Sequence, residues 1–149
     1  MHAGDMKLRL CLLVLFDSLG CRVVPVLEKD TYSTAKLLVR ELVRTQIPLE
    51  VCPTSNLRTR VAESMATHPV RTLIDEGAFV TLNTDDPAMF GCTLAGEYAA
   101  VAGLGYDLAT MRMLAENAID GSWAEPGRKR DLHVGLATWW QERTEPPVA

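Results

Sequence analysis

Apolar residues occur along this chain in two kinds of stretch, short compact runs and longer stretches with a helical repeat. Residues 78–82 and 49–52 are compact runs bounded by glycine or proline, which predicts two short buried strands. Residues 22–27 are rich enough in valine to form a third strand, although Pro25 cannot donate to a sheet and would interrupt it. The pattern therefore predicts three strands.

The longer stretches place apolar residues three or four positions apart. Residues 8–19 carry leucines at this spacing, so we expect a buried amphipathic helix there that Gly20 ends. Asp107 is expected to cap a later helix, and residues 54–60 to form a polar loop. The predicted helices are residues 8–19, 31–46, 69–76, 93–104, 108–119 and 125–141, followed by a frayed tail at 144–149.

Strands that alternate with helices of about ten residues indicate βαβ units and a parallel sheet. We expect a single domain over residues 1–149, because no linker, repeat or low-complexity segment divides the chain. Three strands are few for so many helices, and a sheet that small leaves an edge or a face uncovered. The pattern therefore indicates part of a larger α/β fold.

Charge and composition narrow the class of protein. The net charge is −4 and no basic stripe occurs, so no nucleic-acid partner is expected. The apolar run at 10–16 is too short to span a bilayer, so no membrane span is expected. The four cysteines lie far apart, which favours reduced thiols in the cytoplasm. Residues 18–21 are also similar to a lipoprotein cleavage site, and export with cleavage before Cys21 is the alternative.

Two adjacent carboxylates, Asp85 and Asp86, stand where the strand at 78–82 ends. In α/β sheets, ligands bind at the carboxyl ends of strands. Neighbouring side chains point in different directions, so one aspartate can bind a metal while the other binds a substrate. The alternative is a solvated turn in which an aspartate caps the next helix. The spacing alone leaves both interpretations open.

Several stretches together resemble the adenosine deaminase family of zinc-dependent purine deaminases. The matching residues are Ile47-Pro-Leu-Glu-Val-Cys-Pro-Thr-Ser-Asn56, His68-Pro69 and Thr81-Leu-Asn-Thr-Asp-Asp-Pro87, with Phe90, Leu94, Glu97 and Tyr98. Order and spacing agree over about residues 48–130, whereas residues 6–45 diverge. His2-Ala-Gly-Asp5 is similar to the family's His-Ala-Gly-Glu motif.

The resemblance implies a (β/α)8 TIM barrel of the metal-dependent hydrolase type, with zinc and substrate at the carboxyl ends of its strands. Such barrels need about 250 residues, so the chain is expected to form only roughly the last three to four βα units. The same resemblance implies one zinc ion, with Asp85 and His2 as two of its ligands. Asp86 is expected to hydrogen-bond a purine ring nitrogen, and Asp5 stands where the family has its catalytic glutamate.

The implied reaction is hydrolytic deamination of adenosine or a related 6-aminopurine, nucleoside or base, to the 6-oxopurine and ammonia. Zinc lowers the pKa of its bound water and supplies hydroxide, and a neighbouring carboxylate accepts and returns the proton. Aspartate and histidine suit this chemistry, because carboxylate and imidazole are common zinc ligands.

The sequence departs from the family at its histidines. His2, His68 and His133 are the only three, so the family's zinc-binding His-x-His pair has no counterpart. Residues 22–27 hold no histidine where the family has an Arg-x-Gly-His-Gly motif with a catalytic histidine. Activity of this chain is therefore expected to be impaired or absent. The alternative function is a non-catalytic fragment or pseudoenzyme that acts through self-association or a partner chain at exposed barrel edges.

The other polar residues within the matching stretches have structural explanations. Cys52 is expected in the core, since free cysteine behaves as a small hydrophobe. His68 is expected to shape the start of the helix that Pro69 opens. Ser55 and Asn56 are expected to fix the loop beside the site through local hydrogen bonds.

Overall fold

The computed structural model describes residues 14–17, 20–23 and 31–144, and side chains from residue 36 to residue 143. These parts form a mixed α/β structure that is mostly helical. The strands are β1 (Val14–Asp17), β2 (Gly20–Val23), β3 (Leu49–Val51) and β4 (Val80–Leu82). The helices are α1 (Thr31–Thr45), α2 (Pro53–Arg58), α3 (Val70–Asp75), α4 (Pro87–Phe90), α5 (Leu94–Ala102), α6 (Leu108–Gly121) and α7 (Pro126–Thr144), with a 3₁₀ turn at Met65–Thr67.

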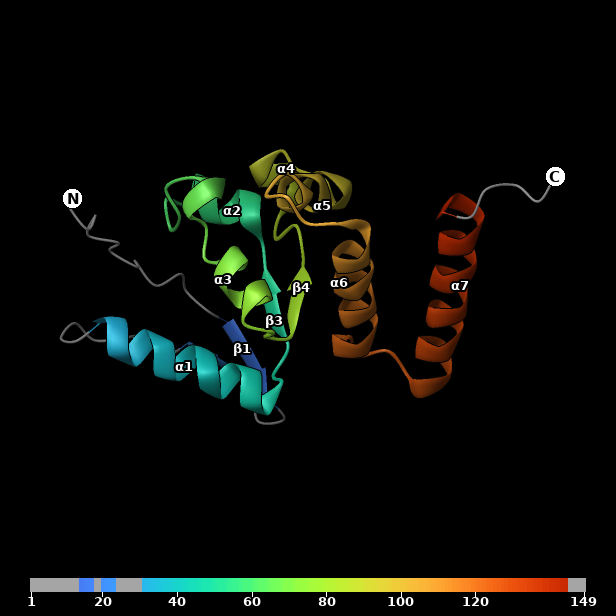
Figure 1. Cartoon of the computed structure of the whole chain (residues 1–149), viewed down its shortest axis with the longest axis horizontal. Coiled ribbons are helices and arrows are strands. Elements are labelled where there is room, and N and C mark those ends of the chain that lie inside the picture. The colour runs from blue at the N-terminus through green and yellow to red at the C-terminus, as the bar shows by residue number, and fades with distance from the viewer. Residues whose placement is uncertain (1–13, 18–19, 24–30, 145–149) are drawn as a thin grey trace.

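The described strands form one sheet in the order β2-β1-β3-β4. β3 and β4 are parallel, with Leu49 opposite Val80 and Val51 opposite Leu82. β1 is antiparallel to both of its neighbours. Figure 1 shows α2, α4 and α5 together at the carboxyl ends of β3 and β4, with α6 beside β4. The parallel pair therefore directs two chain segments to the same edge of the sheet.

The predicted N-terminal helix at 8–19 is wrong where the structure describes it, because residues 14–17 form β1. Their side chains, valine, leucine and phenylalanine, suit a strand as well as a helix. β1 pairs with β2 across a connection of only two residues, with Asp17 opposite Gly20, and it pairs with β3 on its other side. Hydrogen bonding to two neighbouring strands overrides the local helical spacing. Residues 8–13 and 18–19 lie outside the described part.

The third predicted strand, residues 22–27, is found in part. β2 covers Gly20–Val23, while residues 24–27 fall outside the described ranges. Its antiparallel pairing with β1 means that the predicted parallel sheet is confirmed only for β3 and β4. The short connection to β1 explains this, because a parallel pairing needs a much longer crossover.

The predicted polar loop at 54–60 is also wrong, since α2 occupies Pro53–Arg58. Proline favours the first turn of a helix because its φ angle is already helical and its missing N–H is not needed there. The other predicted helices, at 31–46, 69–76, 93–104, 108–119 and 125–141, are confirmed as α1, α3, α5, α6 and α7. The Asp107 cap is confirmed too, because its Oδ1 accepts the Thr110 N–H at 2.9 Å.

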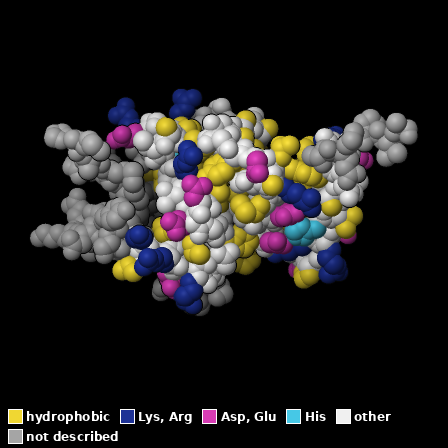
Figure 2. Space-filling view, viewed as in Figure 1, with side chains coloured by type: hydrophobic (Ala, Val, Ile, Leu, Met, Phe, Trp, Pro, Cys, Tyr) yellow, Lys and Arg dark blue, Asp and Glu magenta, His cyan; other side chains and the backbone are white. Residues whose placement is uncertain are grey.

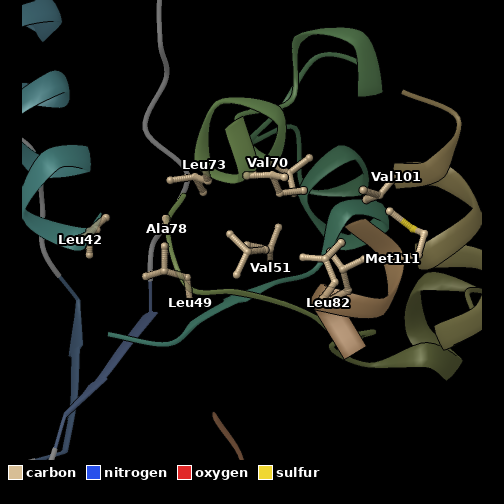
Figure 3. Close-up of a cluster of buried hydrophobic side chains, with 12 residues drawn as sticks. Leu42, Leu49, Val51, Val70, Leu73, Ala78, Leu82, Val101 and Met111 are labelled. Atoms are coloured by element: carbon tan, nitrogen blue, oxygen red, sulfur yellow. The ribbon is translucent and has the colours of Figure 1, made fainter. Parts of the chain in front are cut away.

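The hydrophobic core surrounds the parallel strand pair. All three residues of β4 are buried, while β3 buries Leu49 and Val51 and exposes Glu50 between them. Leu114 of α6 and Val101 of α5 are fully buried against this pair. Figure 3 shows apolar side chains from the strands and from the surrounding helices pointing toward one another. The parallel pair β3–β4 is thus at the centre of the described hydrophobic core.

α7 differs from the other long helices, because none of its residues from 126 to 143 is buried. It lies beyond α6 as seen from the sheet (Figure 1). Two polar contacts join it to the end of α6: His133 Nε2 lies 2.8 Å from Asp120 Oδ1, and Lys129 Nζ donates to the Asp120 carbonyl at 2.7 Å. Both signs of charge are interspersed on the face drawn in Figure 2. No described helix is long and apolar enough to cross a membrane.

Candidate active site

The segments that follow β3 and β4 meet at one edge of the sheet. α2 begins at Pro53, two residues after β3 ends, and Asp85 and Asp86 follow β4 within four residues. The Asn83 N–H donates to the Val51 carbonyl at 2.9 Å, which extends the strand pairing beyond β4. The predicted placement of both aspartates at a strand end is therefore what the structure has.

Asp85 is an exposed residue with a left-handed backbone, φ 57°. This region is unusual for residues other than glycine, although aspartate and asparagine enter it more readily than most. Its carboxylate Oδ2 accepts a hydrogen bond of 2.8 Å from Ser55 Oγ. Ser55 lies in α2 and is only 5% exposed. A buried hydroxyl from one segment thus holds the Asp85 carboxylate of the other.

Asp86 turns in a different direction from Asp85. Its Oδ1 accepts the Met89 N–H at 2.8 Å and caps α4. The helix-cap interpretation is therefore confirmed for Asp86, while Asp85 contacts α2 instead. The two carboxylates thus have different partners within the protein, the Ser55 hydroxyl and the Met89 N–H, while the expected division between a metal and a substrate stays a prediction.

His68 is buried below this edge, at 2% exposure. Its Nδ1 accepts the Val70 N–H at 3.0 Å, at the start of α3, which confirms its expected role at a helix start. Its Nε2 lies 3.1 Å from the Asn56 amide of α2. The Asn56 atom at this distance is the amide nitrogen, Nδ2. Burial lowers the pKa of His68 below its ordinary value, while Glu97 acts in the opposite direction.

Glu97 is one of the residues that carry the family resemblance, and the sequence alone gave it no role. The structure gives it a specific contact. It is fully buried in α5, and its Oε2 accepts the Thr54 N–H of α2 at 2.9 Å. Its Oε1 is buried and has no hydrogen-bond partner among the described residues. The sequence signal is a carboxylate on the buried face of an otherwise apolar helix, Leu-Ala-Gly-Glu-Tyr-Ala-Ala-Val-Ala.

Two cysteines lie beside the aspartate turn. Burial, and then the Asp85 charge, raise the pKa of Cys52 to about 11, so its thiol keeps its proton at neutral pH. The Cys92 thiol donates to the Thr84 carbonyl at 3.4 Å, and burial and then Glu97 raise its pKa too. A protonated thiol is a poor metal ligand and a poor nucleophile. Cys52 is half-buried and lies outside the buried hydrophobic cluster of the described residues, so it is not the core residue that was expected.

The described residues do not make up a zinc site. No group of three or more His, Cys, Asp or Glu side chains among them could hold a metal ion. His68 uses both ring nitrogens in contacts within the protein, and His133 lies on α7 beside Asp120. The two remaining predicted site residues, His2 and Asp5, lie outside the described residues. Asp85 is thus the one predicted zinc ligand that the described part of the chain contains.

Comparison with known proteins gives a family. The family model described as adenosine deaminase matches residues 29–139. An adenine deaminase of Rhodospirillum rubrum is 40% identical over 101 residues, which are 67% of this chain and 30% of that protein. An aminodeoxyfutalosine deaminase of Streptomyces coelicolor is 43% identical over 107 residues, 68% of this chain and 28% of that protein. The chain therefore spans less than a third of the length of these relatives.

Solved structures agree with this match. The adenine deaminase of Arthrobacter aurescens superposes with a TM-score of 0.66 at 34% identity, over 70% of this chain and 32% of that one. The Arabidopsis protein ADAL, solved as a complex with IMP, gives a TM-score of 0.66 at 30% identity, over 78% of this chain and 33% of that one. A Burkholderia ambifaria amidohydrolase with bound Zn gives 0.62 at 24% identity, over 75% and 32%, and shows likeness of fold alone. The described fold thus corresponds to about a third of a deaminase barrel.

Proposed function

The chain belongs to the adenosine deaminase family, and from this premise we propose that it carries one part of a deaminase active site, the end of β4 with Asp85 and Asp86. In the complete site the reaction is hydrolytic deamination of adenosine or a related 6-aminopurine to the 6-oxopurine and ammonia. We further propose that the chain is a single partial domain, roughly the last three to four βα units of a (β/α)8 barrel. Its activity in isolation is impaired or absent.

The observation that carries this proposal is the placement of the two carboxylates. Asp85 stands at the end of the parallel pair with its carboxylate held by Ser55, and we assign it the role of a metal ligand. Asp86 is exposed beside it, and we assign it a hydrogen bond to the purine ring. His2 as a second metal ligand and Asp5 as the proton-transferring acid stay predictions from the resemblance.

Zinc in such a site supplies hydroxide by lowering the pKa of its bound water. Catalytic zinc sites use three protein ligands or more, and the described residues offer Asp85 without such a set. We therefore assign to this chain the holding of Asp85 and Asp86 in place, and not a complete catalytic step. Residence in the cytoplasm belongs to the same proposal, and an N-terminal mass that starts at Cys21 would contradict it.

The first experiment measures zinc per purified chain and the deamination of adenosine and of adenine. We expect far less than one zinc per chain and no more than trace turnover, because three ligands are needed. One zinc per chain with robust turnover that Asp85→Ala abolishes, and Asp131→Ala on exposed α7 does not, would show a complete site in this chain.

A second experiment tests the assigned positions directly. Residues 48–130 of this chain replace the matching segment of the Rhodospirillum rubrum adenine deaminase. If the positions are equivalent, the chimera deaminates adenine and Asp85→Ala removes this activity. Asp131 lies outside the exchanged segment, so it cannot provide the control here. Asp120→Ala, an exposed carboxylate inside the segment, is the matched control and keeps the activity. An active chimera indifferent to Asp85→Ala would refute the assignment.

The second candidate is a non-catalytic protein that acts through self-association or a partner chain. The incomplete metal set of the described residues favours it, together with large apolar side chains at the surface, such as Trp123 at 82% and Met89 at 75% exposure. Sedimentation velocity separates the two cases. A concentration-dependent dimer that stays metal-free supports this candidate, and a compact monomer at all concentrations counts against it.

A further inference from the structure

Glu97 is an acidic side chain with no exposure to solvent. Taking a carboxylate out of water is costly unless it is well paired. Here one oxygen accepts a hydrogen bond from a backbone N–H, and the other has no partner among the described residues. A leucine or methionine would fill the same volume without that cost. The acid therefore needs an explanation beyond packing.

The contact that Glu97 makes joins distant parts of the chain. The residue that donates to it, Thr54, is 43 positions earlier and lies in the first turn of α2. The next residue is Ser55, whose hydroxyl holds the Asp85 carboxylate 30 positions later. Glu97, the first turn of α2 and Asp85 thus form one continuous path from α5 to the end of β4.

α2 needs such an anchor, because it has only six residues. Helices this short are not stable on their own, so their position depends on what they contact. The N-cap residue of α2, Cys52, makes no side-chain cap hydrogen bond, and the Glu97 carboxylate instead binds a free N–H of the first turn. Asp85 in turn holds a left-handed backbone that is disfavoured without a tether.

We propose that Glu97 is a positioning residue, which fixes the first turn of α2 and, through Ser55, holds the Asp85 carboxylate at the end of β4. Glu97 itself does not contact Asp85 in the hydrogen bonds of the described residues. The metal-binding role of the Asp85 carboxylate rests on the proposed function. The hydrogen bonds from Thr54 to Glu97 and from Ser55 to Asp85 are present without metal or substrate.

Four variants of the full chain test the path, each studied without metal. Glu97→Gln keeps an oxygen that can accept the Thr54 N–H, and Glu97→Met keeps the length of the side chain but removes the acceptor. Ser55→Ala removes the hydroxyl and gives the signal of an untethered Asp85. Val101→Ala, a buried residue of the same helix, is the control for destabilisation without loss of the path. The two measurements are the ¹³C shift of the Asp85 carboxyl carbon and the exchange rate of the Thr54 amide.

We expect Glu97→Met to move the Asp85 carboxyl signal to its position in Ser55→Ala and to speed Thr54 exchange by about tenfold or more. Glu97→Gln and Val101→Ala keep the Asp85 signal of the unmodified chain. If Glu97→Met does not fold, Thr54→Pro removes the donor instead, at a helix turn where proline is tolerated, and should shift the signal equally.

An Asp85 signal that stays unchanged in a folded Glu97→Met or Thr54→Pro chain would overturn the inference. So would a shift of the same size in Val101→Ala, because the effect would then follow stability alone. Neither measurement involves zinc or turnover. A chimera without deaminase activity would therefore contradict the proposed function while these signals still decide the role of Glu97.

Discussion

The strand-end region and the α6–α7 region both join helices through polar side chains, but at different depths. At the strand ends these groups are buried, with Glu97 at 0% and His68 at 2% exposure. Between α6 and α7 the pair is His133 with Asp120, whose side chains are 36% and 56% exposed. Exposed pairs are screened by water and contribute little, whereas buried groups must keep their partners. The buried contacts of Glu97 and His68 therefore fix the positions of the helices that they join. The exposed His133–Asp120 pair contributes little to the position of α7.

The contrast between buried and exposed contacts also shows that a longer helix is not always held more firmly in place. α2 has six residues, of which Pro53 and Ser55 are buried, and it is held by Glu97 at its first turn and by His68 at Asn56. α7 has nineteen residues, and none of those whose side chains are described is buried. A short helix with two buried polar anchors is thus placed more definitely than a long helix on a surface.

The largest expected difference in the free energy of unfolding is between variants of the two histidines, His68 and His133. His68→Leu leaves the Val70 N–H without its acceptor, so the free energy of unfolding should fall by about 1–3 kcal/mol. His133→Leu removes a pair at the surface and should change it by less than about 1 kcal/mol. Urea denaturation of both variants at pH 7 makes the comparison. Equal losses would mean that depth does not distinguish the two regions.

A second prediction concerns the backbone of Asp85. Both Asp85→Ala and Asp85→Gly lose the Ser55 hydrogen bond, but only glycine adopts φ 57° freely. The alanine variant should therefore be less stable by about 1 kcal/mol, the cost of a left-handed residue.

The control for this prediction is Asp131 in the interior of α7, where the order should reverse. Glycine should be the less stable variant there by about 1 kcal/mol, because it weakens a regular helix. Thermal unfolding of the four variants gives both differences. An alanine at position 85 as stable as glycine would mean that the turn is not held in the left-handed region.

The smallest expected effect is a pH dependence from His68. Because burial lowers its pKa in the folded chain, the unfolded chain takes up the proton first as the pH falls. Stability from the neutral ring is complete above the unfolded pKa of about 6.5 and is lost as the pH falls below it. His68→Gln should flatten the stability profile below pH 6.5, while His133→Gln, with His68 intact, should keep the decline. A decline of the same size in His68→Gln would assign it to other groups.

Much of the helical structure was predictable because its causes lie within a few residues. The Asp107 side chain binds an N–H three positions later, and the Thr93 side chain does the same at the start of α5. The strand at 80–82 followed from its apolar run, and Asp85 and Asp86 followed from its end. The fold family and its resemblance over about residues 48–130 were also visible in the sequence, and the family is confirmed.

The tertiary structure decided what depends on distant partners. Residues 14–17 lie within a stretch whose leucines have a helical spacing, but pairing with β2 and with Leu49 of β3 makes them a strand. Pro53 favours the start of α2 locally, but the first turn of that helix is bound by Glu97, 43 positions away. Ser55 meets Asp85 only because β3 and β4 are parallel and end at one edge. Caps and propensities act within a turn of the chain, whereas strand pairing and buried polar contacts join segments whose meeting no local pattern encodes.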